Sequence, residues 1–148
     1  MGQSIIIACP LGWKLADFSE CLADCAPENG ASLYESEKEV QLHSDDLEWK
    51  VLVDEMSDRK EIVEDYESND DLDPRFRIVV RTLKFVNVRF GGNFSIVRDF
   101  VKIVCEKSIL RDEEVWIDTD YGWVIQASEL LEHIGRDPSW DWRFKRDI

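Results

Sequence analysis

The 148-residue sequence predicts a single α+β domain, with a mostly antiparallel sheet and about three helices packed on it. Its length suits one domain, and its 44% of hydrophobic residues are enough for a buried core. Several short runs alternate between apolar and polar residues as strands do, while others follow helical spacing. Strand-like runs follow one another at 75–90 and at 114–125, which favours antiparallel neighbours over a wound parallel sheet.

A strand and then an amphipathic helix are predicted at the start of the chain. The run SIIIACP, residues 4–10, has strand character, and Pro10 and Gly12 end it. Residues 14–25 then place apolar side chains at helical spacing. The inward face of this helix is expected to carry Leu15, Phe18, Leu22 and Cys25.

Two strands and a charged segment are predicted for the middle of the chain. EVQLH (39–43) and LEWKVLVDEM (47–56) are the strand candidates, and the Ser-Asp-Asp sequence at 44–46 favours a turn between them. Residues 54–73 carry many charges and few large apolar side chains. We therefore expect this acidic segment to form a surface helix and a loop, which could bulge from the fold.

Period-two alternation predicts two further strands after Pro74. The first is the clearest strand pattern in the sequence, and the second is KFVNVRF, residues 84–90. In the first strand, apolar residues and mainly basic ones occupy opposite faces: Phe76, Ile78 and Val80 against Arg75, Arg77, Val79 and Arg81.

The strongest helix pattern is FSIVRDFVKIVCEK, residues 94–107. The two glycines at 91–92 end the strand before it, and Asn93 is well suited to cap its first turn. One stripe of this helix is apolar and is expected to lie on the sheet. The stripe consists of Val97, Phe100, Val101 and Val104.

A hairpin and a short helix are predicted near the C-terminal end. EVWI (114–117) and YGWVI (121–125) form the two arms of the hairpin, because the residues between them favour a turn. SELLEHI (128–134) then offers three apolar side chains for burial and is expected to end at Gly135.

The charge of the chain points away from nucleic acids and membranes as partners. There are 32 acidic and 18 basic residues, which give a net charge of −14 and a pI near 4.5. Such a chain repels phosphates and anionic lipid surfaces, whereas a basic protein complements it. The N-terminal residues show neither a secretory signal nor a membrane span, so we expect a cytoplasmic protein.

Acidic and basic residues are unevenly distributed along the chain. Residues 37–73 carry 15 acids and 4 bases, whereas residues 74–107 carry 8 bases and 2 acids. Residues 112–137 return to 8 acids and one base. In one interpretation the central arginines pair internally with the acidic segments. In another, a negative face is available to a partner. The two interpretations are compatible.

Cysteine and histidine spacing does not predict a metal site. The four cysteines contain no CxxC pair, and the two histidines have no zinc-type spacing to them. We expect buried thiols in a reducing compartment. The four cysteines are Cys9, Cys21, Cys25 and Cys105, and the two histidines are His43 and His133.

The stretch WIDTDYGWVI, residues 116–125, allows a metal-binding interpretation as well as a hairpin. Asp118, Asp120 and Glu129 fall at positions 1, 3 and 12 of a calcium loop. However, Gly122 stands where a ligand is needed and Trp123 where a glycine is needed, so we favour the hairpin. No phosphate-binding or catalytic motif occurs elsewhere, so neither a cofactor nor catalytic residues are predicted.

The C-terminal third also contains a high density of aromatic residues among carboxylates. Core packing is the favoured role for Trp116 and Trp123, whereas Tyr121, at the turn, is the better candidate for the surface. The aromatic residues of this region are Trp116, Tyr121, Trp123, Trp140 and Trp142.

In its C-terminal third the sequence resembles the bacterial immunity proteins of polymorphic toxin and contact-dependent inhibition systems. The resemblance covers residues 112–143 and rests on three runs: VWIDTDYGWVI, ASELLEHI and DPSWDWR. It is a pattern of residue types and assigns neither a particular family nor a toxin class. It implies a small cytosolic antitoxin that binds and blocks a toxin, without catalysis of its own.

We therefore expect an acidic surface that occludes the active site of a basic toxin, with a nuclease favoured because nucleases are themselves basic. The expected contact residues are Asp118, Asp120 and Tyr121 in one area and Glu61, Glu64, Asp65, Asp70 and Asp71 in another. Two alternatives remain. One is an acidic adaptor or DNA mimic, and the other is a metal-dependent hydrolase that uses Asp118, Asp120 and Glu129.

Overall fold

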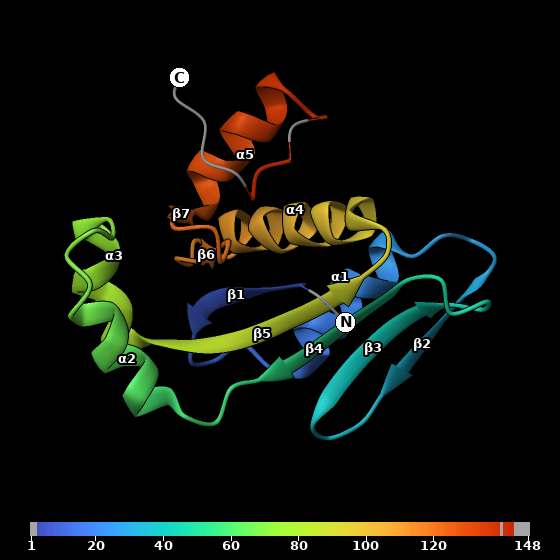
Figure 1. The fold of residues 1–148 in the computed structure, drawn as a ribbon, viewed down its shortest axis with the longest axis horizontal. Helices are drawn as coiled ribbons and strands as arrows, with labels where there is room; N and C mark the ends of the chain where they lie inside the picture. The colour runs from blue at the N-terminus through green and yellow to red at the C-terminus, as the bar shows by residue number, and fades with distance from the viewer. Residues whose placement is uncertain (1–2, 140, 144–148) are drawn as a thin grey trace.

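A seven-stranded antiparallel sheet forms the centre of the computed structural model, which describes residues 3–139 and 141–143 (Figure 1). The strand order is β2-β3-β4-β5-β1-β6-β7. The strands are β1 (Gln3–Pro10), β2 (Ala31–Glu35), β3 (Glu39–Ser44), β4 (Lys50–Glu55), β5 (Leu83–Gly91), β6 (Trp116–Asp118) and β7 (Val124–Gln126). The α-helices within the described residues are α1 (Leu15–Cys25), α2 (Arg59–Glu67), α3 (Pro74–Val79), α4 (Phe94–Leu110) and α5 (Ala127–Arg136). The α+β class is confirmed, and the expected number of about three helices is too low.

The two faces of the sheet bury two separate cores. Neighbouring residues of β1 show the division, because Ile7 belongs to one core and Ala8 to the other. Helices α1, α4 and α5 cover the face of the larger core (Figure 1). Helices α2 and α3 cover part of the opposite face, where Phe85 and Trp116 of the sheet form the smaller core with them.

The strongest sequence patterns form the elements that were predicted from them. The helix pattern at 94–107 becomes α4, whose apolar stripe is fully buried. The side chain of Asn93 caps it by accepting a hydrogen bond from the backbone N–H of Ser95 at 2.9 Å. The predicted final hairpin is also confirmed, although its strands β6 and β7 are only three residues long.

The strand predicted at 75–81 is wrong, because these residues form α3 and a short 3₁₀ helix, Val80–Thr82. Asp73 caps α3 through its side chain, and Pro74 occupies the first turn, where its missing N–H costs nothing. Phe76 and Val80 are four residues apart and both buried. Ile78, which a strand would have buried beside them, is 79% exposed.

The structure differs from the sequence predictions in three smaller ways, which concern β2, the acidic segment 54–73 and the end of α5. The strand β2 was not predicted, since four of its five residues are exposed and no apolar face marks it. The acidic segment 54–73 does not bulge, because Val63 and Tyr66 of α2 pack into the smaller core. Helix α5 ends one residue after Gly135, at Arg136.

Candidate functional site

A cleft of about 500 Å³ opens between the loop that joins α2 to α3 and the hairpin β6–β7. The start of α5 closes one side of it. Four carboxylates line the cleft together with apolar side chains of β7 and its turn. The carboxylates are Asp70, Asp71, Asp73 and Glu129, and the apolar residues include Trp123, Val124 and Ile125.

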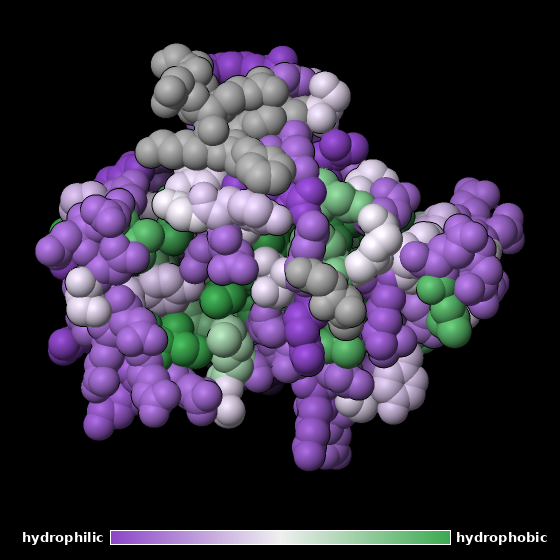
Figure 2. Space-filling view, viewed as in Figure 1, coloured by the Kyte–Doolittle hydropathy of each residue, from purple (hydrophilic) through white to green (hydrophobic). Residues whose placement is uncertain are grey.

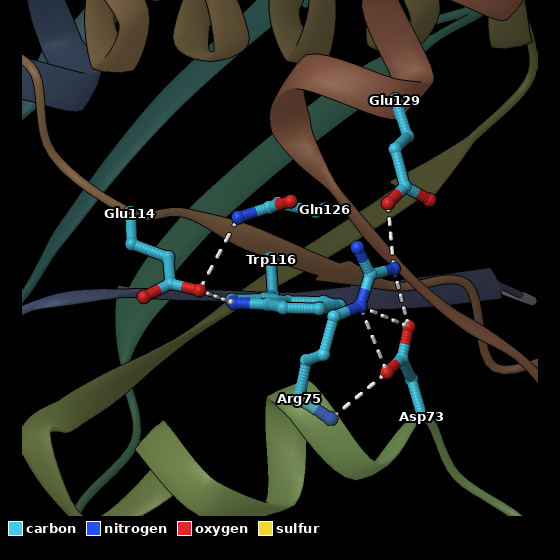
Figure 3. A network of polar contacts seen from close by, with 6 residues as sticks. All are labelled: Asp73, Arg75, Glu114, Trp116, Gln126 and Glu129. Carbon is cyan, nitrogen blue, oxygen red and sulfur yellow. Dashed lines mark hydrogen bonds and ion pairs between the residues drawn. The ribbon is translucent and has the colours of Figure 1, made fainter.

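Arg75 neutralises two of these four carboxylates (Figure 3). Its guanidinium lies 2.7 Å from a carboxylate oxygen of Asp73 and 2.6 Å from one of Glu129. It also lies over the ring of Trp116, 5.6 Å from the centroid. The hydrogen bond from Arg75 lowers the pKa of Asp73 below its usual range. This contact ties α3 to α5 and to β6 beside the cleft.

Trp116 is held from its other end by a second carboxylate contact (Figure 3). Its indole N–H donates to Glu114 at 2.9 Å, and the amide of Gln126 donates to the same oxygen at 3.2 Å. The indole is fully buried, so this hydrogen bond satisfies a donor that would otherwise be costly. The prediction that Trp116 packs in the core is confirmed.

Asp118 connects the hairpin to α2. One of its carboxylate oxygens accepts from the hydroxyl of Tyr66 at 2.6 Å, and the other accepts from the backbone N–H of Asp120 at 3.0 Å. Burial, followed by the negative charge of Asp118, raises the pKa of Tyr66 above its usual range. Asp118 is half-buried, and its carboxylate is engaged within the protein.

Replacing Asp118 with alanine is expected to lower the free energy of unfolding by about 1–3 kcal/mol, because the hydroxyl of Tyr66 loses its partner in a largely buried position. Asp120→Asn serves as the control, since the Asp120 side chain is exposed and accepts no hydrogen bond from another described residue. Urea denaturation of both variants measures the difference. Equal stability of the two variants would show that the Tyr66–Asp118 contact contributes nothing.

The turn between β6 and β7 presents Asp120 and Tyr121 at the surface. Asp120 has a left-handed backbone, with φ of 63°, and an exposed side chain. Tyr121 is 45% exposed, as predicted, and the guanidinium of Arg143 lies 5.8 Å from its ring centroid. Trp123 is half-buried, and its indole N–H donates to the backbone carbonyl of Arg143 at 3.0 Å. Trp140 lies outside the described residues.

The acidic residues of α2 and its following loop are exposed beside this turn. Figure 2 shows hydrophilic residues over α2 and α3, on the left of the view, with hydrophobic residues visible between them and the centre of the molecule. Asp70 is 93% exposed and pairs with Arg77 at 3.2 Å. Five other acidic residues form no ion pair with any described residue: Glu61, Glu64, Asp65, Asp71 and Asp120.

The fold brings parts of the two predicted contact areas near each other, but of the predicted residues only Asp70 and Asp71 line the cleft. Asp71 lines it from the α2–α3 loop, and Gly122, two residues after Asp120, lines it from the hairpin. The Tyr66–Asp118 hydrogen bond joins the two areas across 52 positions of sequence. The acidic residues of α2 lie outside the cleft, and one of them, Glu64, lines a second hollow among basic side chains of α2 and the 3₁₀ helix.

Most of the basic side chains that follow Pro74 form ion pairs within the molecule, as one of the two interpretations predicted. Besides Arg75, the internal pairs join Arg77 to Asp70, Arg81 to Glu67, Lys84 to Glu55 and Arg89 to Asp54. Asp73 was missed as a site residue, although an aspartate directly before a proline is a recognisable helix start.

Neither the proposed calcium ligands nor the thiols gather into a metal centre within residues 3–139 and 141–143, where no group of three or more His, Cys, Asp or Glu side chains is arranged to hold an ion. Glu129 binds Arg75, while Asp118 binds Tyr66. Of the four free cysteines, Cys9, Cys21 and Cys105 are buried and Cys25 is partly so. Among the described helices, none has both the length and the apolar character to cross a membrane.

The cleft thus has an apolar wall and four carboxylates, of which three are ion-paired with Arg75 or Arg77 and one, Asp71, forms no ion pair with a described residue. Comparison of the chain with protein-family models, with curated proteins and with solved structures gave no match.

Proposed function

We propose that this protein is an immunity protein, which binds a bacterial toxin and neutralises it by covering its active site. The observation that carries the proposal is a group of exposed carboxylates on α2, the α2–α3 loop and the β6–β7 turn that form no ion pair with any described residue, one of which, Asp71, lines the cleft. We call this group, Glu61, Asp65, Asp71 and Asp120 with the half-exposed Tyr121, the acidic surface. The sequence resemblance across residues 112–143 supports the same function.

The acidic surface favours a basic protein as the partner. Unpaired carboxylates repel each other in the free protein, and a cationic partner removes this repulsion when it binds. The pairing of Arg75 with Asp73 and Glu129 illustrates, within the chain, how the cleft accommodates a guanidinium. An arginine or lysine of the toxin enters the same cleft beside Asp71, with its aliphatic part against Val124.

A nuclease is the toxin class that fits this chemistry best. Nucleases bind the phosphates of their substrate through basic side chains, and those side chains are the natural targets of exposed carboxylates. Occupying them blocks the substrate without any reaction by the inhibitor. Tyr121 supplies an aromatic contact at the edge of the acidic surface, where amphipathic rings commonly anchor interfaces.

The direct test looks for a toxin domain encoded beside the gene of this protein and combines the two proteins. Co-expression in a bacterial host should restore growth that the toxin alone prevents. With the purified proteins, nuclease activity should fall to zero at one equivalent of inhibitor. Continued toxicity together with an absence of complex would refute the proposal. Comparable binding to several unrelated DNA-binding proteins would instead indicate an acidic DNA mimic.

Charge removal within the acidic surface tests the assigned residues. The double variant Glu61→Gln, Asp71→Asn should reduce the association rate with the toxin about tenfold at low ionic strength, because electrostatic steering depends on these charges. The effect should shrink as salt is added, since screening then weakens the steering in both proteins. Stopped-flow measurements over a salt series provide the association rate of each protein and its dependence on salt concentration.

A matched control is available on the opposite side of the sheet. Asp24→Asn, Glu106→Gln removes one aspartate and one glutamate charge from α1 and α4, where both side chains are exposed. Its net charge equals that of the test variant, so any effect of total charge is the same in the two. An equal loss of association rate in both variants would show that the acidic surface is not the contact.

A further inference from the structure

The strand β2 forms an open edge of the sheet. Among the strands that the structure describes, it is the first in the order and pairs with β3 alone. Four of its five residues are exposed, among them Leu33 at 38% and Tyr34 at 55%. An edge of this kind presents unpaired backbone N–H and C=O groups, which form a template for another strand.

The register of the β2–β3 hairpin identifies the residues whose backbone groups point outward. Ser36 N–H donates to the carbonyl of Glu39, and Asp45 N–H donates to the carbonyl of Gly30. Hydrogen-bonded and non-hydrogen-bonded pairs alternate along an antiparallel ladder, so Ser32 and Tyr34 also bond to β3. The N–H and C=O groups of Ala31, Leu33 and Glu35 therefore face away from the sheet.

The opposite edge of the sheet is different. Strand β7 is only three residues long, and α5 begins directly after it at Ala127. Short edge strands and covering helices are common ways of preventing edge-to-edge pairing. Strand β2 has neither protection, and its sequence, ASLYE, contains no proline or lysine. The edge of β2 is thus the one of the two that can accept a strand.

We propose that β2 pairs in an antiparallel manner with β2 of a second copy of this chain, so that two sheets join across a two-fold axis at Leu33. This register places Leu33 opposite Leu33 of the other copy and Ala31 opposite Glu35. All outward-facing groups of both strands are then used, in about six backbone hydrogen bonds. Shifting either strand by two residues would leave some of these groups unpaired.

The side chains are compatible with this register. Leucine faces leucine at the axis, Ser32 faces Tyr34, and the carboxylate of Glu35 faces the methyl group of Ala31, so no like charges stand directly opposite each other. Within each copy, Glu35 already accepts a hydrogen bond from the hydroxyl of Ser19. The strand is complementary to itself, which favours a second copy over an unrelated strand as the occupant.

The dimer is expected to be weak and to depend on salt in an unusual direction. A single added strand buries little surface, which places the contact among transient interfaces. Each copy carries a net charge of −14, so the two copies repel at low ionic strength. Adding salt should therefore strengthen the dimer, whereas it should slow the proposed association with a basic toxin. The two surfaces lie at opposite ends of the sheet, so one dimer exposes two acidic surfaces (Figure 1).

Sedimentation velocity of the intact chain over a range of concentrations tests the proposal. The weight-average sedimentation coefficient should rise with concentration, and more so at high salt. Leu33→Lys places two like charges at the axis and should raise the dissociation constant at least tenfold, or about 1.4 kcal/mol. Leu110→Lys makes the same substitution at a residue of α4 that is 87% exposed and should leave dimerisation unchanged.

Disulfide formation tests the register itself. Hydrogen-bonded antiparallel pairs have Cα atoms about 5.5 Å apart, within the range that a disulfide spans. Leu33→Cys should thus cross-link two copies under mild oxidation, and faster than Leu110→Cys, which is more exposed and reports random collisions. The native thiols react slowly by comparison, because burial raises the pKa of Cys21 to about 11 and that of Cys25 to about 12.

Two results would overturn the proposal. One is a single monomeric species at every protein and salt concentration. The other is faster cross-linking of the Leu110→Cys variant than of the Leu33→Cys variant. If the chain stays monomeric while Leu33→Lys weakens binding of the toxin, the edge accepts a strand of the toxin instead. None of these outcomes bears on the effect of the Glu61 and Asp71 substitutions, so this proposal and the proposed function fail separately.

Discussion

Replacing Phe76 with alanine is expected to lower the free energy of unfolding by about 3–5 kcal/mol, which is a large part of the stability of a typical domain. Phe76 is fully buried in the smaller core. Its ring lies 5.0 Å from that of Tyr66 and 5.3 Å from that of Trp116, measured between centroids. Alanine leaves a cavity between α2, α3 and the sheet, and chemical denaturation measures its cost.

The same experiment with Ile78→Ala provides the control. Ile78 is 79% exposed, so its truncation should change the free energy of unfolding by less than about 0.5 kcal/mol. If residues 75–81 instead formed a strand, Phe76 and Ile78 would share one face and both substitutions would be costly. A similar loss in the two variants would therefore contradict the helix α3.

The error at residues 75–81 has a physical origin. A segment of seven residues spans less than two helical turns, so apolar residues at every second position fit both a strand and a helix that buries its first and last members. The deciding information lies just before the segment, where Asp73 and Pro74 form a helix start. The helix-start residues decide the structure of this segment, and the alternating apolar pattern does not. A helix buries Phe76 and Val80 and, of these three apolar residues, leaves only Ile78 exposed.

The longer sequence patterns were predicted correctly because each of them fits only one type of secondary structure. Helix α4 repeats its apolar spacing over several turns and carries its own cap at Asn93, so no other element satisfies the pattern. The hairpin turn likewise needs residues that tolerate positive φ, and Asp120 and Gly122 supply them. Strand β2 was missed because its pairing with β3 is specified by backbone hydrogen bonds and hardly by buried side chains.

The candidate site was predictable in its composition but not in its arrangement. The sequence located the acidic residues near Asp70 and those near Asp120, which are about fifty positions apart. Their meeting depends on β6 pairing with β1, which places the hairpin under α2 and α3. No local pattern encodes this pairing. The ion pair of Arg75 with Glu129 depends on it as well, whereas that of Arg77 with Asp70 joins residues only seven positions apart.

Replacing Gly92 with alanine is expected to destabilise the fold by about 2–5 kcal/mol, from backbone strain and from a steric clash together. Gly92 has φ of +88°, in the region that alanine rarely adopts. A Cβ atom there would lie 2.5 Å from the backbone carbonyl oxygen of Glu48 and 2.8 Å from the Cβ of Trp49. Neither atom is the end of a flexible side chain, so the β3–β4 turn or the start of α4 has to move.

Gly122→Ala separates the two contributions. Gly122 has almost the same φ, +89°, but a Cβ at this position meets no atom within 4 Å. Its substitution should thus cost only the backbone strain, about 1–2 kcal/mol. The difference between the two variants in urea denaturation then measures the close approach of Gly92 to the β3–β4 turn. Equal losses of unfolding free energy in the two variants would mean that the β3–β4 turn moves without cost to make room for the Cβ atom. The contact of Gly92 with Glu48 and Trp49 would then not determine where α4 begins against the sheet.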